Sequence, residues 1–198
     1  MTTTTAAGGT ARPTRPFEGL TIPEPGIFEL DPMHTQVGFV ARHMMVSKVR
    51  GRFTDYSGTL TVADDPLASR IAVLVKTASV STGEAPRDAH LRSGDFFDSE
   101  TYPELSFSTT ALEHRRDNSF EVTGELTIKG VSKSVTLDVD FEGVIVDPYG
   151  NERIGFTARG EVDRYDYGLT WGAALEAGGL VVARKVILEL EAEAVRAA

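Results

Sequence analysis

The chain of 198 residues contains no cysteine, and this absence excludes several classes of site. Disulfide frameworks, thiolate nucleophiles and zinc or iron–sulfur centres built on cysteine all need a residue that is missing here. Basic residues are also in the minority, because 20 Lys and Arg stand against 29 Asp and Glu and give a net charge of −9. This balance argues against a nucleic-acid partner and against loose adsorption on anionic membrane surfaces, since both need clustered positive charge.

No uninterrupted apolar run approaches the ~20 residues that a membrane-spanning helix needs, so the sequence predicts no transmembrane segment. The stretch from Met1 to Pro16 is rich in Thr, Ala, Gly and Pro, and it contains no basic patch followed by an apolar core. We therefore expect no secretory signal, a cytoplasmic protein, and a disordered N-terminal leader over residues 1–24. Residues 25–198 are expected to form one domain, because this length is enough for a sizeable core without a metal or a disulfide.

Short segments in which every second residue is apolar dominate the chain from Gly26 onward. In Val135–Glu142 and in most of Val186–Glu193, apolar and polar residues alternate, which places the apolar side chains on one face of a strand. A brief helical turn is expected over Met44–Lys48, and a short helix over Pro86–Phe97. The strands expected from the pattern are 26–31, 36–42, 49–53, 56–62, 70–77, 104–112, 119–128, 133–146, 153–163 and 181–194.

Strands with one wet face and one dry face are typical of antiparallel sheets. Because the sequence predicts almost no helix, the apolar faces of the strands must pack against one another. A sandwich and a closed barrel are the two arrangements that achieve this. Closure into a barrel removes the exposed edges that would otherwise pair with other chains. A barrel of about eight strands leaves room inside for packed side chains or for one small elongated ligand.

Seven segments of the chain resemble the YceI family of lipocalin-like, polyisoprenoid-binding proteins, in their order as well as in their residues. They are Phe28–Phe39, Arg42–Phe53, Arg87–Asp98, Tyr102–Phe107, Gly124–Val131, Gly155–Phe156 and Asp163–Gly168. Together they cover roughly Gly26 to Glu193. Two features depart from the family pattern: Thr35 takes the place of the serine in Asp-x-x-His-Ser, and the secretory signal of many members is lacking, so we do not expect a periplasmic role.

The resemblance implies an all-β fold, namely an eight-stranded antiparallel lipocalin-like barrel with a short helical segment. It also implies an apolar tunnel that binds, stores or transports a long-chain isoprenoid lipid, such as a polyprenyl phosphate or a quinone tail. Such a protein needs no catalytic residues, no metal and no cofactor apart from the bound lipid. We therefore expect a binding protein and not an enzyme, and the resemblance also allows a homodimer.

The expected ligand-binding residues fall into two groups. Aromatic rings supply large contact area and methionine adapts to irregular shapes, so the apolar lining is expected from Phe39, Met44, Met45, Phe53, Phe107, Phe156 and Trp171. Arginine and protonated histidine can hold phosphate oxygens, so a polar head group is expected to meet His43, Arg87, Asp88, His90 and Arg92. The apolar residues could equally fill a solid core, and Arg87 and Asp88 could instead form a structural ion pair or a helix cap.

Three other functions are compared with the lipid-binding hypothesis. His34, His43 and His90 could gather as three ligands of a catalytic metal, although the spacings typical of such sites are absent. Ser93, near His90 and Asp88, is a weaker indication of hydrolytic chemistry, because no nucleophile-elbow motif accompanies it. A ligand-free stress or interaction module on the same barrel is the third alternative, and it predicts an interior filled by the protein's own side chains.

Overall fold

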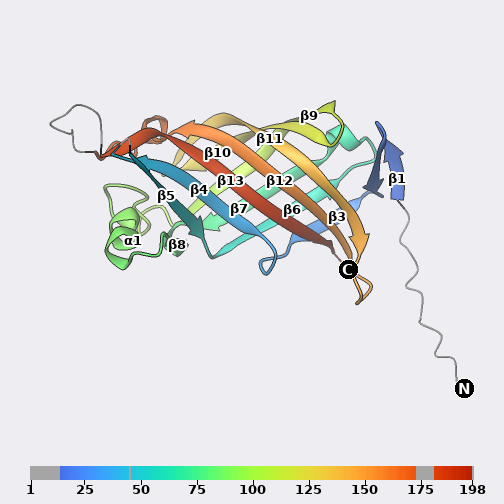
Figure 1. The fold of residues 1–198 in the computed structure, drawn as a ribbon, viewed down its shortest axis with the longest axis horizontal. Helices are drawn as coiled ribbons and strands as arrows, with labels where there is room; N and C mark the ends of the chain where they lie inside the picture. Colours follow the sequence, from blue (N-terminus) through green and yellow to red (C-terminus); the bar gives the residue numbers. More distant parts are fainter. Residues whose placement is uncertain (1–13, 45, 173–180, 198) are drawn as a thin grey trace, which may run out of the picture.

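The computed structural model describes residues 14–44, 46–172 and 181–197 (Figure 1). Its strands are β1 (Thr14–Phe17), β2 (Leu20–Pro23), β3 (Gly26–Leu30), β4 (Gln36–His43), β5 (Ser47–Phe53), β6 (Tyr56–Val62), β7 (Arg70–Lys76), β8 (Val80–Ser81), β9 (Glu104–Arg116), β10 (Ser119–Ile128), β11 (Val131–Val146), β12 (Glu152–Asp163) and β13 (Val182–Arg196). The helical elements are α1 (Ala85–Arg92) and the 3₁₀ turns η1 (Pro66–Ala68), η2 (Thr77–Ser79) and η3 (Arg164–Tyr167). Within the described ranges, no helix has both the length and the apolar character needed to cross a membrane.

The strands from β3 to β13 join in one antiparallel sheet that closes on itself. Neighbouring strands pair in chain order from β9 through β10, β11 and β12 to β13. The three remaining strands of the ring are bent, and each consists of two halves: β3 with β4, β5 with β6, and β7 with β8. The first bent strand pairs with β13, the second with the first, and the third with the second and with β9, so eight strands complete the barrel.

The bend between β3 and β4 is a bulge of the chain beside β13. The backbone N–H of Asp31 donates to the carbonyl of Glu193 at 2.9 Å, and the hydroxyl of Thr35 donates to the same carbonyl at 3.1 Å. Pro32 lies between them and cannot donate a ladder hydrogen bond, so the strand leaves the sheet there and returns at Thr35. The bulge therefore displays the side chains of Asp31 and His34 at the rim of the barrel.

The alternation predicted from the sequence determines which side chains face inward. In β13, Val186, Leu188 and Leu190 border the interior, whereas Ile187 borders a groove on the outer surface. Two predicted strands, 56–62 and 119–128, have the predicted bounds. The predicted fold, an eight-stranded antiparallel barrel with one short α-helix, is confirmed.

The expected leader over residues 1–24 is wrong in its second half, whereas residues 1–13 lie outside the described residues. β1 and β2 form a hairpin in which Thr14 lies opposite Pro23 and Phe17 opposite Leu20. Glu18 and Gly19 make the turn with φ angles of 48° and 84°, the left-handed conformation that two-residue hairpin turns favour. The Thr- and Pro-rich composition concealed this hairpin, because its stability comes from packing on the barrel.

The helical turn expected over Met44–Lys48 is also wrong. β4 continues to His43 and β5 begins at Ser47, and these two residues pair across a tight hairpin turn. The ladder between the two strands satisfies the backbone groups that a helical turn would have had to pair internally. The expected helix is shorter than predicted as well, because α1 ends at Arg92 and the chain then turns through Ser93, which accepts a hydrogen bond from the N–H of Phe96 at 3.0 Å.

A buried ion pair ties the last strand to β12. The Nε of Arg196 lies 2.5 Å from Oε2 of Glu152, whose side chain is only 1% exposed. The same guanidinium donates to the carbonyls of Glu24 and Pro25 at 2.8 and 3.0 Å, and it lies 4.5 Å from the centre of the Phe28 ring. This one side chain thus joins β12, β13 and the segment that leads into β3.

Replacing Glu152 with Ala should lower the free energy of unfolding by about 3–5 kcal/mol, because Arg196 would keep a largely buried charge without its carboxylate. Urea unfolding followed by circular dichroism measures this change. The control is Glu161→Ala, which removes an exposed carboxylate paired with Lys185 and should cost less than about 1 kcal/mol. Equal losses in the two variants would contradict the role given to the buried pair.

Candidate functional site

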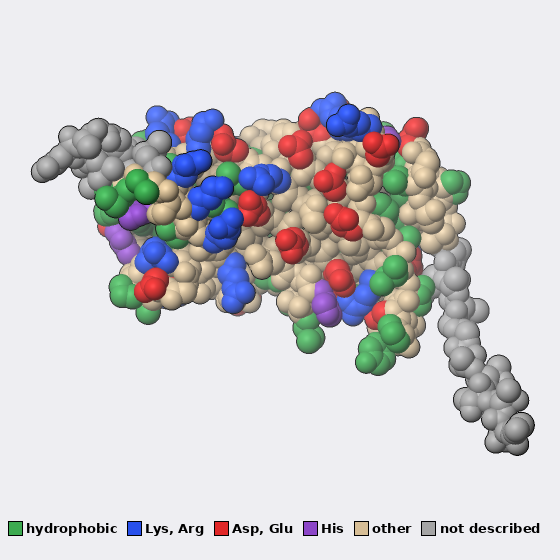
Figure 2. All heavy atoms as spheres, viewed as in Figure 1, with side chains coloured by type: hydrophobic (Ala, Val, Ile, Leu, Met, Phe, Trp, Pro, Cys, Tyr) green, Lys and Arg blue, Asp and Glu red, His purple; other side chains and the backbone are tan. Residues whose placement is uncertain are grey.

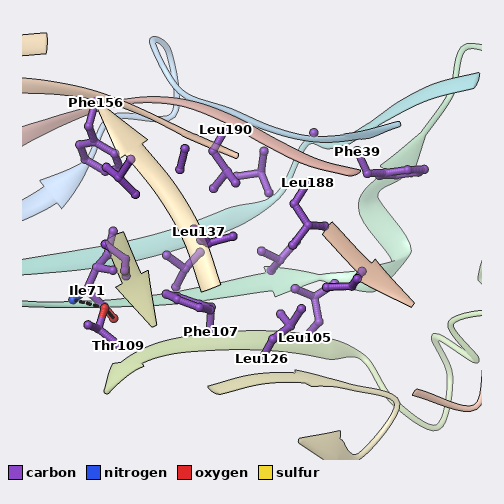
Figure 3. A pocket seen from close by; sticks show the side chains of 18 of the residues that line it. Phe39, Ile71, Leu105, Phe107, Thr109, Leu126, Leu137, Phe156, Leu188 and Leu190 are labelled. Carbon is purple, nitrogen blue, oxygen red and sulfur yellow. Dashed lines mark hydrogen bonds between the residues drawn. The ribbon is translucent and has the colours of Figure 1, made fainter. Parts of the chain in front are cut away.

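The barrel encloses a cavity of about 330 Å³, and its wall is almost wholly apolar. Figure 3 shows the lining side chains of different strands turned toward one another, among them Phe39, Leu137, Phe156 and Leu188. The volume lies within the range of ~300–1,000 Å³ that is usual for small-molecule pockets. Apolar cavities of this kind exclude water and accept apolar ligands, so the interior is suited to hydrocarbon.

The β1–β2 hairpin lies at one end of the barrel (Figure 1) and forms part of the cavity wall there. Phe17, Ile22 and Pro23 line the cavity, and the Phe17 ring stacks 6.4 Å from that of Phe120. The guanidinium of Arg15 donates to the carbonyls of Ala63 and Asp64, in the loop that follows β6. The hairpin is thus held to the rim by the side chain of Arg15 and to the interior by its apolar side chains.

The opposite end of the barrel is covered by α1 and the loop that follows it. Leu91, Phe96 and Phe97 line the cavity there. Trp171 packs against Phe96 at 5.4 Å between ring centres and edge-on against His90 at 4.7 Å. The two ends therefore differ in kind, because one is built from a hairpin and the other from a helix and an aromatic cluster.

Arg164, in η3, is a buried cation that borders the cavity at the α1 end. Its guanidinium donates only to backbone carbonyls: to Ala183 at 3.0 Å, to Val182 at 3.0 Å, to Trp171 at 2.7 Å, and to Leu169. Burial lowers the pKa of Arg164 from its usual value. Within the described residues no carboxylate forms an ion pair with it, and its guanidinium also lies over the ring of Tyr165, 4.8 Å from the ring centre.

Tyr167, also in η3, is 2% exposed and borders the same cavity. Its hydroxyl has no hydrogen-bond partner within the described residues. Burial raises the pKa of Tyr167 to about 12, so the phenol stays neutral and remains a donor. By contrast, the hydroxyls of Ser69 and Thr109, at the other end of the cavity, accept hydrogen bonds from the N–H groups of Ala63 and Ile71.

The segment Asp163–Gly168 resembles the YceI family in sequence, but the sequence predicted no ligand contact for Arg164 or Tyr167. Neither residue type is unusual after a strand, and no local spacing distinguishes them. Only the burial of both side chains beside one cavity reveals them, and burial depends on residues far along the chain.

Four of the residues predicted to line the tunnel do line the cavity: Phe39, Phe53, Phe107 and Phe156. They come from β4, β5, β9 and β12, so distant parts of the sequence meet on one surface. Trp171 is half-buried in the aromatic cluster beside α1 and is not part of the cavity wall. Met44 is exposed in the β4–β5 turn, away from the cavity, and Met45 lies outside the described residues.

The polar residues predicted for the tunnel mouth do not face the cavity. Asp88 is buried and accepts hydrogen bonds from both the N–H and the hydroxyl of Thr82, at 2.8 and 2.5 Å, and Arg87 donates to that hydroxyl at 2.7 Å. His90 lies 2.8 Å from a carboxylate oxygen of Asp95. These side chains hold the loop around α1 together.

His43 and Arg92 also lie outside the cavity wall. His43 is half-buried at the end of β4, where it pairs with Val182 across the sheet. Arg92 donates to the carbonyls of Ala78 and Val80 at 2.7 and 2.9 Å, which ties α1 to the strand before it. None of the five residues predicted to meet a head group therefore lines the cavity, and their contact with a ligand stays a prediction.

The three histidines of the metal hypothesis do not meet. In the part of the chain that the structure describes, the single set of possible metal ligands is Asp31, His34 and Glu193. A cation already occupies this position, since Nη1 of Arg153 lies 2.6 Å from Asp31 and 3.2 Å from Glu193. The arrangement is that of a structural ion-pair network at the β3–β4 bulge.

The sequence model of a protein family, described as the YceI-like domain, matches residues 28–194 of this chain. The chain belongs to the YceI family. One relative is a UPF0312 protein of Staphylococcus epidermidis, which is 34% identical over 84% of this chain and 95% of its own length. The β1–β2 hairpin precedes the residues that the family model matches.

Solved structures show the same barrel in other members of the YceI family and beyond. The YceI protein of Campylobacter jejuni matches with a TM-score of 0.68 and 33% identity, over 79% of this chain and 90% of that one. A polyisoprenoid-binding domain from Saccharophagus degradans matches with a TM-score of 0.65 and 18% identity, over 88% of this chain and all of that one (100%). The second likeness, at this identity, concerns the fold.

The network around Arg153 should make this YceI-family protein sensitive to acid. Arg153 lowers the pKa of Asp31 to about 2, and it holds that of Asp147, 2.8 Å away, well below its usual range. Both carboxyls have lower pKa values in the folded than in the unfolded state, so their stabilising effect is present above about pH 4 and is lost as the pH falls toward 2. We expect the free energy of unfolding to decrease over this window.

The measurement is urea unfolding of the protein and of Arg153→Met at neutral pH and at several values below pH 4. The variant should be less stable by about 3 kcal/mol at neutral pH, and the difference should shrink as Asp31 and Asp147 become protonated. Arg159→Met is the control, because its exposed pair with Glu189 should contribute less than about 1 kcal/mol. A difference that does not change with pH would contradict the account.

Proposed function

We propose that this protein binds a long-chain isoprenoid lipid inside its barrel, as a carrier or store and without catalysis. The observation that supports this is the apolar cavity of about 330 Å³ enclosed by the eight strands. Each methylene that leaves water for such a site gains about 0.8 kcal/mol, so a branched hydrocarbon tail of several units would bind tightly. Aromatic side chains such as Phe107 and Phe156 offer broad, shape-tolerant contact surface for such a tail.

The comparisons support the same ligand class. The chain belongs to the YceI family, and a structurally similar domain of Saccharophagus degradans is described as polyisoprenoid-binding. The main alternative is a ligand-free module, whose interior would be filled by its own side chains. The apolar cavity favours the lipid-binding protein over this alternative. The cytoplasmic location stays a prediction from the sequence, and the homodimer stays one from the family resemblance.

The polar end of the lipid belongs, in this proposal, at the η3 end of the cavity. Among the described residues, the Tyr167 hydroxyl has no hydrogen-bond partner there, and Arg164 forms no ion pair with a carboxylate. An oxygen-bearing head, such as the phosphate of a polyprenyl phosphate or a quinone carbonyl, would satisfy the phenol and be attracted by the guanidinium. The tail would then extend toward Phe17 and Ile22 of the hairpin.

Organic extraction and mass spectrometry of the purified protein provide the first test. We expect copurified isoprenoid lipid, and a protein without copurified lipid should bind an added polyprenyl phosphate. Leu188→Trp should reduce this binding at least about tenfold, because the indole would occupy space that the tail needs.

Ile187→Trp is the matched control, because the neighbouring side chain lies on the outer face of the same strand. It should leave lipid binding unchanged, and thermal unfolding of both variants reports whether the barrel is retained. No copurified lipid together with no binding of any prenyl probe would refute the proposed function.

Tyr167→Phe tests the position of the head group. The change removes only the hydroxyl, so it should weaken binding of geranylgeranyl phosphate about three- to tenfold, while binding of the pure hydrocarbon squalene stays the same. The stability of the lipid-free protein should not fall, since the hydroxyl has no partner within the described residues. Tyr149→Phe, which removes an exposed phenol hydroxyl away from the cavity wall, is the control. An equal loss for both lipids would place the head group elsewhere.

A further inference from the structure

The outer face of β4 and β5 carries four exposed basic side chains, which we call the basic patch: Arg42, Lys48, Arg50 and Arg52. In the register of the hairpin, Arg42 lies opposite Lys48, while Arg50 and Arg52 follow at alternate positions of the same strand. All four therefore project from one face. Figure 2 shows Lys and Arg side chains gathered over this half of the molecule, whereas Asp and Glu are more frequent over the other half.

The charge of the basic patch is not compensated by its neighbours. The nearby acidic side chains pair with other cations across β12 and β13, as Asp163 with Arg184 at 2.6 Å, Glu161 with Lys185 at 2.6 Å, and Glu189 with Arg159 at 3.4 Å. No ion pair found in the described part of the chain includes Arg42, Lys48, Arg50 or Arg52. Arg42 and Lys48 also lie opposite each other, and two like charges in this position destabilise a strand pair. The stability of the fold therefore does not explain why both residues are basic.

The tip of the same hairpin is apolar and exposed. The side chains of Met44 and Val46 are 44% and 87% exposed, and they follow Arg42 and precede Lys48 in the chain. Met44 has a φ of 50°, a conformation that favours glycine or asparagine, so the backbone does not account for a methionine here. Apolar side chains displayed between basic ones are typical of segments that enter the interface of a lipid bilayer.

The hairpin tip lies at the η3 end of the barrel. His43 pairs with Val182 at the start of β13, and the carbonyl of Val182 accepts a hydrogen bond from Arg164 at 3.0 Å. Figure 1 places the β4–β5 turn and α1 at the same end of the molecule, opposite the β1–β2 hairpin. A surface touched by this tip would therefore face the end of the cavity that holds Tyr167 and Arg164.

We propose that the basic patch and the β4–β5 tip dock the barrel on an anionic lipid membrane. The four cations would attract the head groups, and Met44 and Val46 would enter the interface between head groups and chains. The net charge of −9 does not oppose this orientation, because the potential close to a surface depends on the charges within about a Debye length of it. Docking would bring the η3 end of the cavity to the bilayer, where a membrane lipid could be exchanged.

Flotation of the full-length protein with vesicles tests the proposal without any isoprenoid. Vesicles of phosphatidylcholine alone are compared with vesicles that also contain phosphatidylglycerol. We expect binding to the anionic vesicles only, and a decrease in binding as salt is added. Each basic side chain near the surface contributes about fivefold, so Arg50→Glu combined with Arg52→Glu should weaken binding more than about tenfold.

Two matched controls separate the patch from general charge and general hydrophobicity. Arg115→Glu combined with Arg116→Glu changes the net charge equally but lies at the end of β9, beside the β1–β2 hairpin, and it should bind anionic vesicles like the unchanged protein. Val46→Ser should weaken binding, whereas Ile145→Ser, which also removes an exposed aliphatic side chain but from β11, should not. Thermal unfolding of each variant shows that the barrel is retained.

Three outcomes would overturn the proposal: no binding to anionic vesicles, equal loss in the patch and control variants, or salt-dependent binding to a DNA duplex in place of vesicles. Binding of polyprenyl phosphate is measured separately on the same variants. A patch variant that loses vesicle binding but still takes up lipid from detergent supports the docking surface and leaves the cavity as the lipid site. Vesicle binding by a protein that takes up no prenyl lipid would support docking while the proposed cargo fails.

Discussion

The pairing of β12 with β13 is the constraint on which the rest of the structure depends, because it closes the sheet. Eleven residue pairs, from Arg153 opposite Val195 to Asp163 opposite Lys185, form this ladder. Once the ring is closed, its circumference is set by eight strands held at fixed spacing, and it cannot shrink without breaking backbone hydrogen bonds. Side chains of ordinary size do not fill the enclosed volume completely, and the apolar cavity is the space that remains.

Closure also decides where polar groups can lie. The middle of the barrel is lined by apolar side chains such as Leu137 and Leu188, and a charge there would lose its hydration without recovering it. Charged and hydrogen-bonding groups therefore gather at the ends, with Arg196 and Glu152 at one end and Arg164 at the other. The two ends of the barrel consequently differ in their charged groups. A ligand with one polar end would therefore have a preferred direction in the cavity.

Residue type was enough to select Phe39, Phe53, Phe107 and Phe156 as lining candidates, and the resemblance to the YceI family added the barrel. The residues predicted to meet the head group do not line the cavity. Arg87, Asp88 and His90 are polar residues in a loop, and such residues are most often satisfied by their own neighbours, as Asp88 is by Thr82. Tyr167 could not be found in this way, because an unsatisfied hydroxyl is defined by what surrounds it.

The sequence by itself determined strands with one apolar and one polar face, because period-two alternation is a local property that the chain carries wherever it folds. Only the tertiary structure decided that a cavity remains, that the hairpin of Phe17 and Ile22 lines one end of it, and that the Tyr167 hydroxyl has no partner among the described residues. It also decided the distribution of charge. The net charge of −9 does not reveal the basic face on β4 and β5, because it adds the charges of all residues. A surface presents only the charges that the fold brings together.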